Sequence, residues 1–227
     1  MVDDLDEDVR DIPVDTAVLL TLANGYLDAF TYVGHGHVFA NAQSGNVILL
    51  GVELAQPDIG VALDHLWPVL AFVAGIAAAQ VVSRRATGLR WRDPRPLVLG
   101  LQVLILLVVA LLPTSAPNWT VTTSVGFASA LQMASFRTVR SSTFVPIAMT
   151  GNLMRTTEAI TDLAHGEGER RLVALYVGLI ATFFVGALLG AIATDHLVRA
   201  SSLVPALLLL VAGLLLFRRV AHDPVAG

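Results

Sequence analysis

The stretch Phe39-Ala40-Asn41-Ala42-Gln43-Ser44-Gly45-Asn46 has a counterpart later in the chain, Phe144-Val145-Pro146-Ile147-Ala148-Met149-Thr150-Gly151-Asn152. In both copies a hydroxyl residue, glycine and asparagine follow a phenylalanine within otherwise apolar sequence. The two glycines are 106 positions apart in a chain of 227 residues. The repetition predicts a protein built from two related halves, and chance similarity between apolar strings is the alternative explanation.

The composition around these motifs indicates a membrane protein. Hydrophobic residues make up 55% of the chain and charged residues 14%, which is too apolar for an ordinary soluble domain. The uncharged stretch between Pro96 and Phe136 is divided by a polar turn at 113–118 into two pieces, each close to the length of a membrane span. Further uncharged stretches lie at 66–83, 172–194 and 200–217. The stretch 13–33, which contains Asp15 at its edge and Asp28 inside, is another candidate and brings the expected spans to six.

The arginines decide the topology. All fourteen basic residues are arginine, and cytoplasmic loops of membrane proteins carry an excess of positive charge. Suppose that the motif segments 34–55 and 137–164 each enter and leave the membrane on the same face. Twelve arginines then lie on the face that also holds both termini, and Arg199 lies on the other face. Arg155 lies within a motif segment. These twelve are Arg10, Arg84, Arg85, Arg90, Arg92, Arg95, Arg137, Arg140, Arg170, Arg171, Arg218 and Arg219. If both motif segments crossed fully, the arginines would divide about evenly between the two faces.

We therefore expect an all-α integral membrane protein with six transmembrane helices plus two re-entrant half-helix segments. The two halves form inverted repeats of three spans each, in the cell (inner) membrane, with both termini cytoplasmic. The expected organisation is an acidic tail at 1–12, a first membrane repeat at 13–112, a second at 113–217 and a short tail at 218–227. The acidic tail lacks the basic region of a signal peptide, so it is expected to be kept.

The motif segments are the expected binding site. Non-helical backbone at membrane depth is tolerated only inside protein or beside a water-filled cavity. Ser, Thr and Asn are natural N-caps, which predicts short helices over 47–55 and 153–164. In inverted halves their N-termini meet near the midplane, where backbone amides and helix dipoles favour an anion or a polar solute. The predicted site residues here are Gln43, Ser44, Gly45, Asn46, Thr150, Gly151 and Asn152; the alternative is ordinary loop-to-helix caps at the surface.

Three further site residues lie on the flanking spans, and a fourth lies within a motif segment. Asp28 is an ionisable residue inside a span, with Asn24 one turn earlier, and Gln132 takes the corresponding place in the second half. Asp28 could instead cap the re-entrant segment structurally. Arg155, one turn beyond Gly151, could meet an anionic substrate, although a local pair with Glu158 is the favoured interpretation.

The chain resembles the YoaK-like family of bacterial multi-pass membrane proteins, which carry a domain of unknown function. The matching features are Gly25-Tyr26-Leu27-Asp28-Ala29, the first motif, Leu131-Gln132 followed by Arg137, and Thr143-Phe144 through Asn152. The resemblance covers nearly the whole chain and implies a multi-spanning inner-membrane protein. It does not supply a substrate.

The sequence thus predicts a transporter or channel-like protein for a small polar or anionic solute. The alternative is a non-transporting scaffold, assembly or sensory subunit. An enzyme is not expected, because the chain lacks zinc-protease, serine-hydrolase and phosphate-loop motifs. No cofactor is expected and no metal, because Gly34-His35-Gly36-His37 offers two histidines without a nearby carboxylate.

The expected partners are the lipid bilayer and the solute. No nucleic acid is expected, because no basic stripe with interleaved aromatic residues is present. A homo-oligomer is possible. Gly178, Thr182, Gly186 and Gly190 form a stripe of small residues that indicates close helix packing, and the stripe around Gly186 is one candidate interface between copies.

Overall fold

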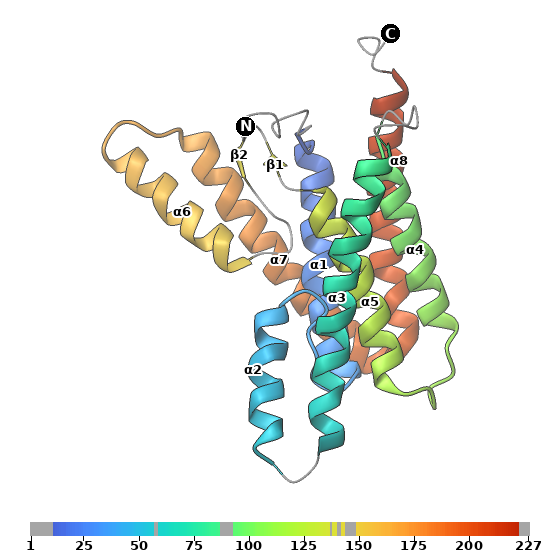
Figure 1. The fold of residues 1–227 in the computed structure, drawn as a ribbon. Coiled ribbons are helices and arrows are strands. Elements are labelled where there is room, and N and C mark those ends of the chain that lie inside the picture. Colours follow the sequence, from blue (N-terminus) through green and yellow to red (C-terminus); the bar gives the residue numbers. More distant parts are fainter. Residues whose placement is uncertain are drawn as a thin grey trace.

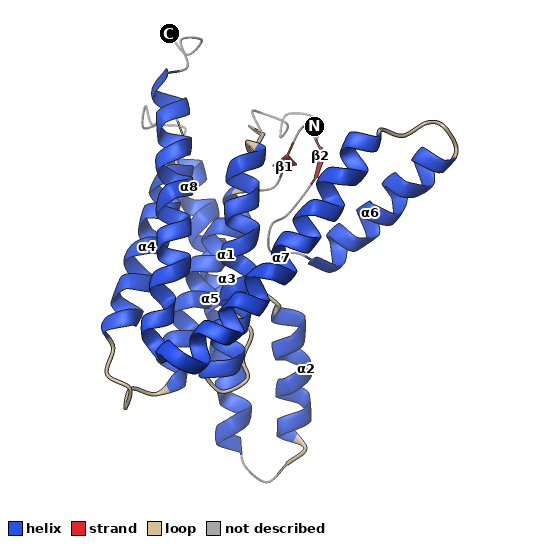
Figure 2. Ribbon diagram, turned by 180° about the vertical axis from the view of Figure 1, so that it is seen from behind, coloured by secondary structure: helices blue, strands red, loops and turns tan. Residues whose placement is uncertain are grey.

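The helices of the computed structural model follow the apolar stretches of the sequence (Figure 1). The structure describes residues 11–56, 59–86, 93–136, 138–139, 142–143 and 149–222. The helices are α1 (Val14–Gly34), α2 (Gln43–Leu54), α3 (Ile59–Ala86), α4 (Arg95–Leu111), α5 (Asn118–Ser135), α6 (Met149–Ala164), α7 (Arg170–Leu197), a 3-10 helix (Val198–Ser202) and α8 (Leu203–His222). Two short strands, β1 (Thr138–Val139) and β2 (Ser142–Thr143), pair antiparallel with Thr138 opposite Thr143 (Figure 2).

Several helix boundaries agree with the sequence. The prediction of two helices separated by a turn at 113–118 is confirmed, because α4 ends at Leu111 and α5 begins at Asn118. The helix expected at 66–83 is longer, since α3 already begins at Ile59 and packs along α2 with its first turns. Most of the predicted acidic tail (1–10) and Phe144–Ala148 of the second motif lie outside the described residues.

The helices differ in where they begin along the bundle (Figure 1). Helices α1, α3, α4, α5, α7 and α8 run along the bundle, whereas α2 and α6 begin near its middle and extend toward opposite ends. The start of α1 and the end of α8 share one end of the bundle, where Arg219 Nη2 lies 2.6 Å from Asp15 Oδ2. The two motif segments therefore lead into helices that begin near the middle of the bundle and lie at its edge, α2 against α3 and α6 against α7.

The packing follows a regular scheme. Helix α1 packs against α7, α3 against α5, and α4 against α8, while α2 lies on α3 and α6 lies on α7. Glycines make the close approaches possible, because a methyl group at Gly186 would overlap the Leu22 backbone, and one at Gly75 would lie 2.6 Å from the Phe127 carbonyl oxygen. The close helix packing predicted for the small-residue stripe is confirmed at Gly186 and Gly190, which are buried against α1 of the same chain, and an interface between copies at this stripe stays a prediction.

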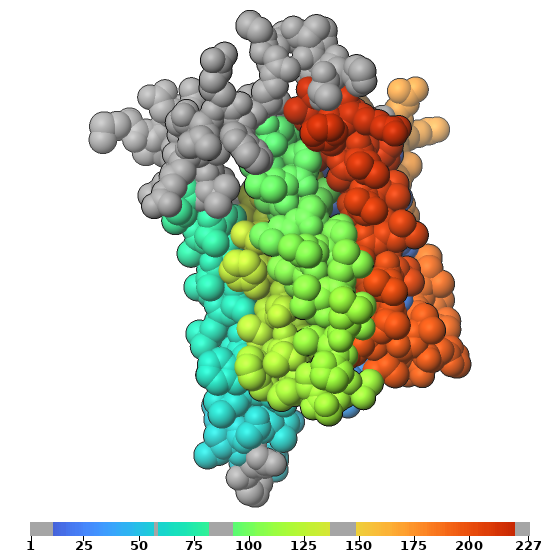
Figure 3. All heavy atoms as spheres, turned by 90° about the vertical axis from the view of Figure 1, so that its right-hand side faces the viewer, coloured from blue at the N-terminus to red at the C-terminus, as the bar shows by residue number. Residues whose placement is uncertain are grey.

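The outer surface of the bundle is apolar. In Figure 3, α4 and α8 lie side by side. The side chains of Leu104, Leu111, Leu207 and Leu214 on these two helices are exposed. Among the described residues, the helical stretches Ile59–Val81 and Arg170–Val220, the latter comprising α7 and α8, are long and apolar enough to cross a bilayer. An apolar surface of this extent is typical of contact with lipid.

The end of the bundle opposite Asp15 is closed by one arginine. Arg199, in the 3-10 helix, is 4% exposed and donates hydrogen bonds to the carbonyl oxygens of Pro113, Thr114 and Ala116 in the α4–α5 loop. Arg199, which the arginine distribution places on the opposite face from the other loop arginines, therefore donates to loop carbonyls that lack helical hydrogen-bond partners.

Candidate functional site

The first motif begins with a tight reversal of the chain after α1. Gly36 and His37 adopt positive φ angles of 81° and 58°, and the His37 N–H donates to the Tyr32 carbonyl oxygen at 3.1 Å. His35 is buried, with its ring centroid 4.5 Å from that of Phe30. The two histidines thus shape a turn, and the described residues contain no group of three potential metal-ligating side chains.

Helix α1 holds the returning segment through Asn41. The Asn41 backbone N–H donates to Asp28 Oδ1 at 2.7 Å, and the Asn41 side-chain amide donates to the Asn24 carbonyl oxygen at 3.0 Å. Both Asp28 and Asn41 are largely buried, with exposed fractions of 8% and 5%. Asp28 therefore supports the segment that leads into α2, as its structural interpretation predicts.

The remaining polar residues of the first motif satisfy the broken backbone. Asn46 is fully buried; its Oδ1 accepts the Phe39 N–H at 2.9 Å, and its Nδ2 donates to the Phe39 carbonyl oxygen at 2.8 Å and to Gln43 Oε1 at 2.9 Å. Gln43 Nε2 donates in turn to the Ala40 carbonyl oxygen at 2.9 Å. These side chains replace the hydrogen bonds that helix or water would otherwise supply.

The prediction that Ser44 caps a helix starting at 47 is wrong. Helix α2 begins at Gln43, its N-cap is Ala42, and no side chain caps it. Ser44 and Gly45 thus lie in the first turn, because the hydrogen bonds of Asp28 and Asn46 fix the backbone before the helix begins. Thr150 and Gly151 likewise lie inside α6, which begins at Met149.

The polar residues of the second motif, which lie in α6, differ in how far they are buried. Asn152 is fully buried, whereas Thr150 is exposed at the start of the helix. Arg155 Nη1 donates to the Gly151 carbonyl oxygen at 3.3 Å, within its own helix. The ion pairs between described residues are Arg95–Asp93 and Arg219–Asp15, so the expected Arg155–Glu158 pair is wrong.

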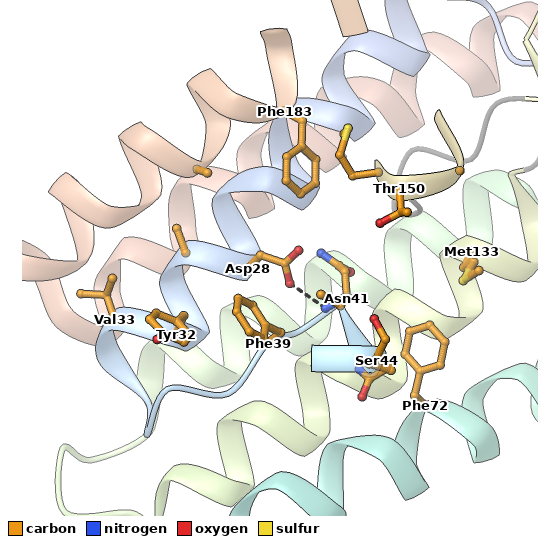
Figure 4. A pocket seen from close by; sticks show the side chains of 16 residues that line it. Asp28, Tyr32, Val33, Phe39, Asn41, Ser44, Phe72, Met133, Thr150 and Phe183 are labelled. Carbon is orange, nitrogen blue, oxygen red and sulfur yellow. Dashed lines mark hydrogen bonds between the residues drawn. The ribbon is translucent and has the colours of Figure 1, made fainter. Parts of the chain in front are cut away.

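The two motifs face one cavity of about 610 Å³ (Figure 4). Five of the predicted site residues line it, namely Asp28, Gln43, Ser44, Thr150 and Gly151. The other predicted residues, Asn24, Gly45, Asn46, Gln132, Asn152 and Arg155, do not. Gln132 is buried and its side-chain amide has no hydrogen-bond partner among the described residues.

Among the described residues that line it, the cavity is mostly apolar and has one charged side chain. Eleven lining residues were not expected from the sequence: Ala29, Tyr32, Val33, Phe39, Asn41, Ala42, Phe72, Met133, Met149, Phe183 and Ala187. Asp28 supplies the charge, and the Tyr32 and Phe39 rings stack beside it with centroids 4.8 Å apart. A cavity of this size, with few polar groups among apolar walls, is typical of a small-molecule site.

Comparison with known proteins identifies the family. The model of a family described as "Protein of unknown function (DUF1275)" matches residues 16–215. The chain belongs to the DUF1275 family. The UPF0700 transmembrane protein YoaK of Bacillus subtilis (strain 168) is 30% identical over 94 residues, a segment that covers 41% of this chain and 42% of that protein. No solved structure matches the chain.

Family membership and the apolar helices together show that this DUF1275 chain is a membrane protein. The resemblance to the YoaK-like family is thereby confirmed. Because the matched segment covers less than half of YoaK, that relative supports the family and the membrane location only.

The cavity of this DUF1275 chain is lined by residues from both motif segments and from two further stretches of similar sequence. The motif register pairs Ser44 with Thr150, and the sequence similarity of Phe72-Val73-Ala74-Gly75 to Phe183-Phe184-Val185-Gly186 pairs Phe72 with Phe183. Both members of each pair line the cavity. This internal repetition was the available signal for the two phenylalanines. Tyr32 lies one turn after Asp28 on the same face of α1, so its place in the cavity could have been predicted from the position of Asp28 alone.

Proposed function

We propose that this protein is a small transporter or channel of the cell (inner) membrane that moves a polar solute through the cavity between the two motifs. One observation carries the proposal: Ser44 and Thr150, at the starts of two helices that extend toward opposite ends of the bundle, line the same cavity as the buried carboxylate Asp28. Broken helices at corresponding places in duplicated halves mark the substrate sites of many transporters.

The proposed architecture is six membrane spans and two re-entrant helices arranged as inverted repeats. The helix contacts support it. Exchanging α1, α2, α3 and α4 for α5, α6, α7 and α8 converts the α1–α7 contact into α5–α3, α2–α3 into α6–α7 and α1–α8 into α5–α4, and each of these contacts occurs. If a two-fold axis relates the two halves, every helix contact has such a counterpart.

The proposed orientation has both termini in the cytoplasm. It rests on the arginine distribution and on the Asp15–Arg219 pair, which joins the start of α1 to the end of α8. In this orientation α2 extends from the cavity toward the outer face and α6 toward the cytoplasm (Figure 1).

Thiol labelling tests the proposal, because the chain contains no cysteine. Ser44→Cys and Thr150→Cys should react with a membrane-impermeant maleimide in inside-out or right-side-out vesicles. Ile48→Cys and Met154→Cys are matched controls, since these apolar side chains lie one turn further along the same helices and are 66% and 59% exposed on the bundle surface. They should be protected by lipid. If both cavity cysteines are protected from both faces, there is no water-accessible cavity and the proposal fails.

The second candidate is a non-transporting scaffold, assembly or sensory subunit. The hydrogen bonds of Asp28 and Asn46 within the first motif favour it, because a purely structural motif requires no more than these. Under that alternative, Asp28→Asn and Asn46→Ala lower stability, and the four cysteine variants are equally unreactive.

A further inference from the structure

The cavity extends further toward one end of the bundle than toward the other. Its lining residues on α1 are Asp28, Ala29, Tyr32 and Val33, which all lie in the last two turns of that helix. Tyr32 and Val33 are 38% and 40% exposed. Since α1 starts near Asp15 and runs away from it, the cavity reaches the surface toward the end of the bundle opposite Asp15.

The two halves of the chain have the same register in the structure as in the sequence. Gly186 of α7 and Gly75 of α3 are counterparts. A methyl group at Gly186 would lie 3.1 Å from the Tyr26 nitrogen, and one at Gly75 would lie 2.7 Å from Ala130 Cβ. Tyr26 and Ala130 are 104 positions apart, which is also the separation of Asp28 from Gln132. The contacts of α1 and α5 therefore support this pairing.

In this register both halves line the central part of the cavity (Figure 4). Ala29 lines it together with its counterpart Met133. Phe183 lines it together with its counterpart Phe72. The middle of the cavity is thus shared by α1 and α5 and by α7 and α3.

The open end of the cavity is lined by one set of counterparts and not by the other. Tyr32 of α1 and Ala187 of α7 line it. Their counterparts, Phe136 after α5 and Ile76 on α3, do not, and Phe136 is fully buried. A two-fold arrangement of helices therefore holds a cavity that opens on one side only, as far as the described residues define it.

Gln132, the counterpart of Asp28, is buried without hydrogen bonds. It is 1% exposed, and neither its Nε2 nor its Oε1 has a partner among the described residues. Leaving buried polar groups unpaired is costly, and polar residues within membrane helices ordinarily mark a solute pathway. Both facts are explained if Gln132 lines the cavity in another arrangement of the helices, as Asp28 does in this one.

We propose that Gln132 lines the cavity in a second state of the protein, in which the cavity opens toward the Asp15 end of the bundle. In that state the two halves exchange their arrangements, so that the α5 residues take the places that Asp28 and Tyr32 have here. Rocking of one repeat against the other around a central site is a general way in which inverted repeats move a solute. The inference rests on the proposed function and adds the residue that meets the polar solute on the second side.

Thiol labelling of single cysteines from each face of the membrane tests the inference. In sealed vesicles of both orientations, Tyr32→Cys should react with a membrane-impermeant maleimide from one face, and Gln132→Cys from the opposite face only. Ser129→Cys is the matched control. Ser129 is fully buried on the same helix, its hydroxyl is also unpaired among the described residues, and its counterpart Gly25 does not line the cavity.

The second state should make the two buried positions differ in rate. If it is populated at about 1%, Gln132→Cys should react about tenfold or more faster than Ser129→Cys, which becomes accessible only by unfolding. Phe136→Cys probes the same opening and replaces Gln132→Cys if denaturation shows that variant to be unfolded. The inference is overturned if the probe reacts no faster than the control, if it reacts from the face that labels Tyr32→Cys, or if Tyr32→Cys is unreactive from both faces.

A double variant tests whether the two openings alternate. In Tyr32→Cys/Gln132→Cys, prior reaction of the first cysteine with a bulky maleimide should hold the first opening and slow labelling of the second about tenfold. An unchanged rate would contradict the exchange of states. If Gln132→Cys is unreactive while Ser44→Cys and Thr150→Cys still react, the second state is rejected and the proposed function stands.

Discussion

Replacing Asn46 by alanine removes the side chain that holds the broken backbone of the first motif. Three hydrogen bonds of 2.8–2.9 Å are lost, two of them to the N–H and carbonyl groups of Phe39. Leaving a buried polar group unpaired costs about 1–3 kcal/mol, and Phe39 is half-buried, so the lower end of the range applies to each group. We expect Asn46→Ala to lower the free energy of unfolding by about 2 kcal/mol or more.

Denaturation of the purified protein in mixed micelles with increasing SDS, followed by tryptophan fluorescence, measures this loss. Val47→Ala is the matched control, since Val47 is the next residue, is 53% exposed and makes no hydrogen bond with its side chain. A surface substitution of this kind changes stability by at most about 0.5 kcal/mol. If the two variants are equally stable, Asn46 does not support the re-entrant backbone and the reasoning is refuted.

Three other substitutions test the packing and the ends of the bundle, each by the same denaturation assay. Gly186→Val places a branched side chain against the Leu22 backbone and should destabilise by about 2 kcal/mol or more; a neutral result would mean that α1 and α7 are not in contact. Arg199→Met removes the donor of the part-buried loop carbonyls and should cost about 1–3 kcal/mol, so an unchanged midpoint would count against this closure of the α4–α5 loop. Arg219→Ala breaks an exposed ion pair with Asp15 and should lower the free energy of unfolding by about 1 kcal/mol or less. A larger loss would contradict the exposed position of this pair.

The helical elements could be predicted from the sequence because their signals are local. The turn at 113–118 contains prolines at positions 113 and 117 within a long uncharged stretch, and α4 and α5 are separated there. The polar motifs in apolar surroundings likewise indicated the two short helices α2 and α6. The thickness of the bilayer and its lack of water limit the length and polarity of a membrane helix, and these limits can be read from the sequence.

The capping of the short helices could not be predicted in the same way. Ser44 and Thr150 have the chemistry of N-caps, but α2 begins at Gln43 because the Asn41 N–H is accepted by Asp28, which lies thirteen residues before Asn41. Such a bond depends on how the chain reverses at Gly36 and His37, which residue type alone does not determine. The Arg155–Glu158 pair was wrong for a related reason, since the Arg155 guanidinium has a nearer acceptor in the Gly151 carbonyl.

The candidate site was predicted in part, and the residues that were missed are mainly apolar. Tyr32, Phe39, Phe72 and Phe183 line the cavity, yet an aromatic residue in a membrane helix is ordinarily interpreted as packing or lipid contact. Their function as cavity walls follows from the meeting of helices that are far apart in the sequence. Asn46 and Asn152, by contrast, are polar but buried away from the cavity.

The central claim is that the N-termini of α2 and α6 meet across one cavity. Cross-linking of the double variant Ser44→Cys/Thr150→Cys with a short bis-maleimide tests it directly in the cysteine-free chain, with Ile48→Cys/Met154→Cys as the control pair. We predict an intramolecular cross-link, seen as a mass shift of one linker with both thiols consumed, for the first pair and not for the second. Failure of the first pair to cross-link while each single cysteine reacts would contradict the claim.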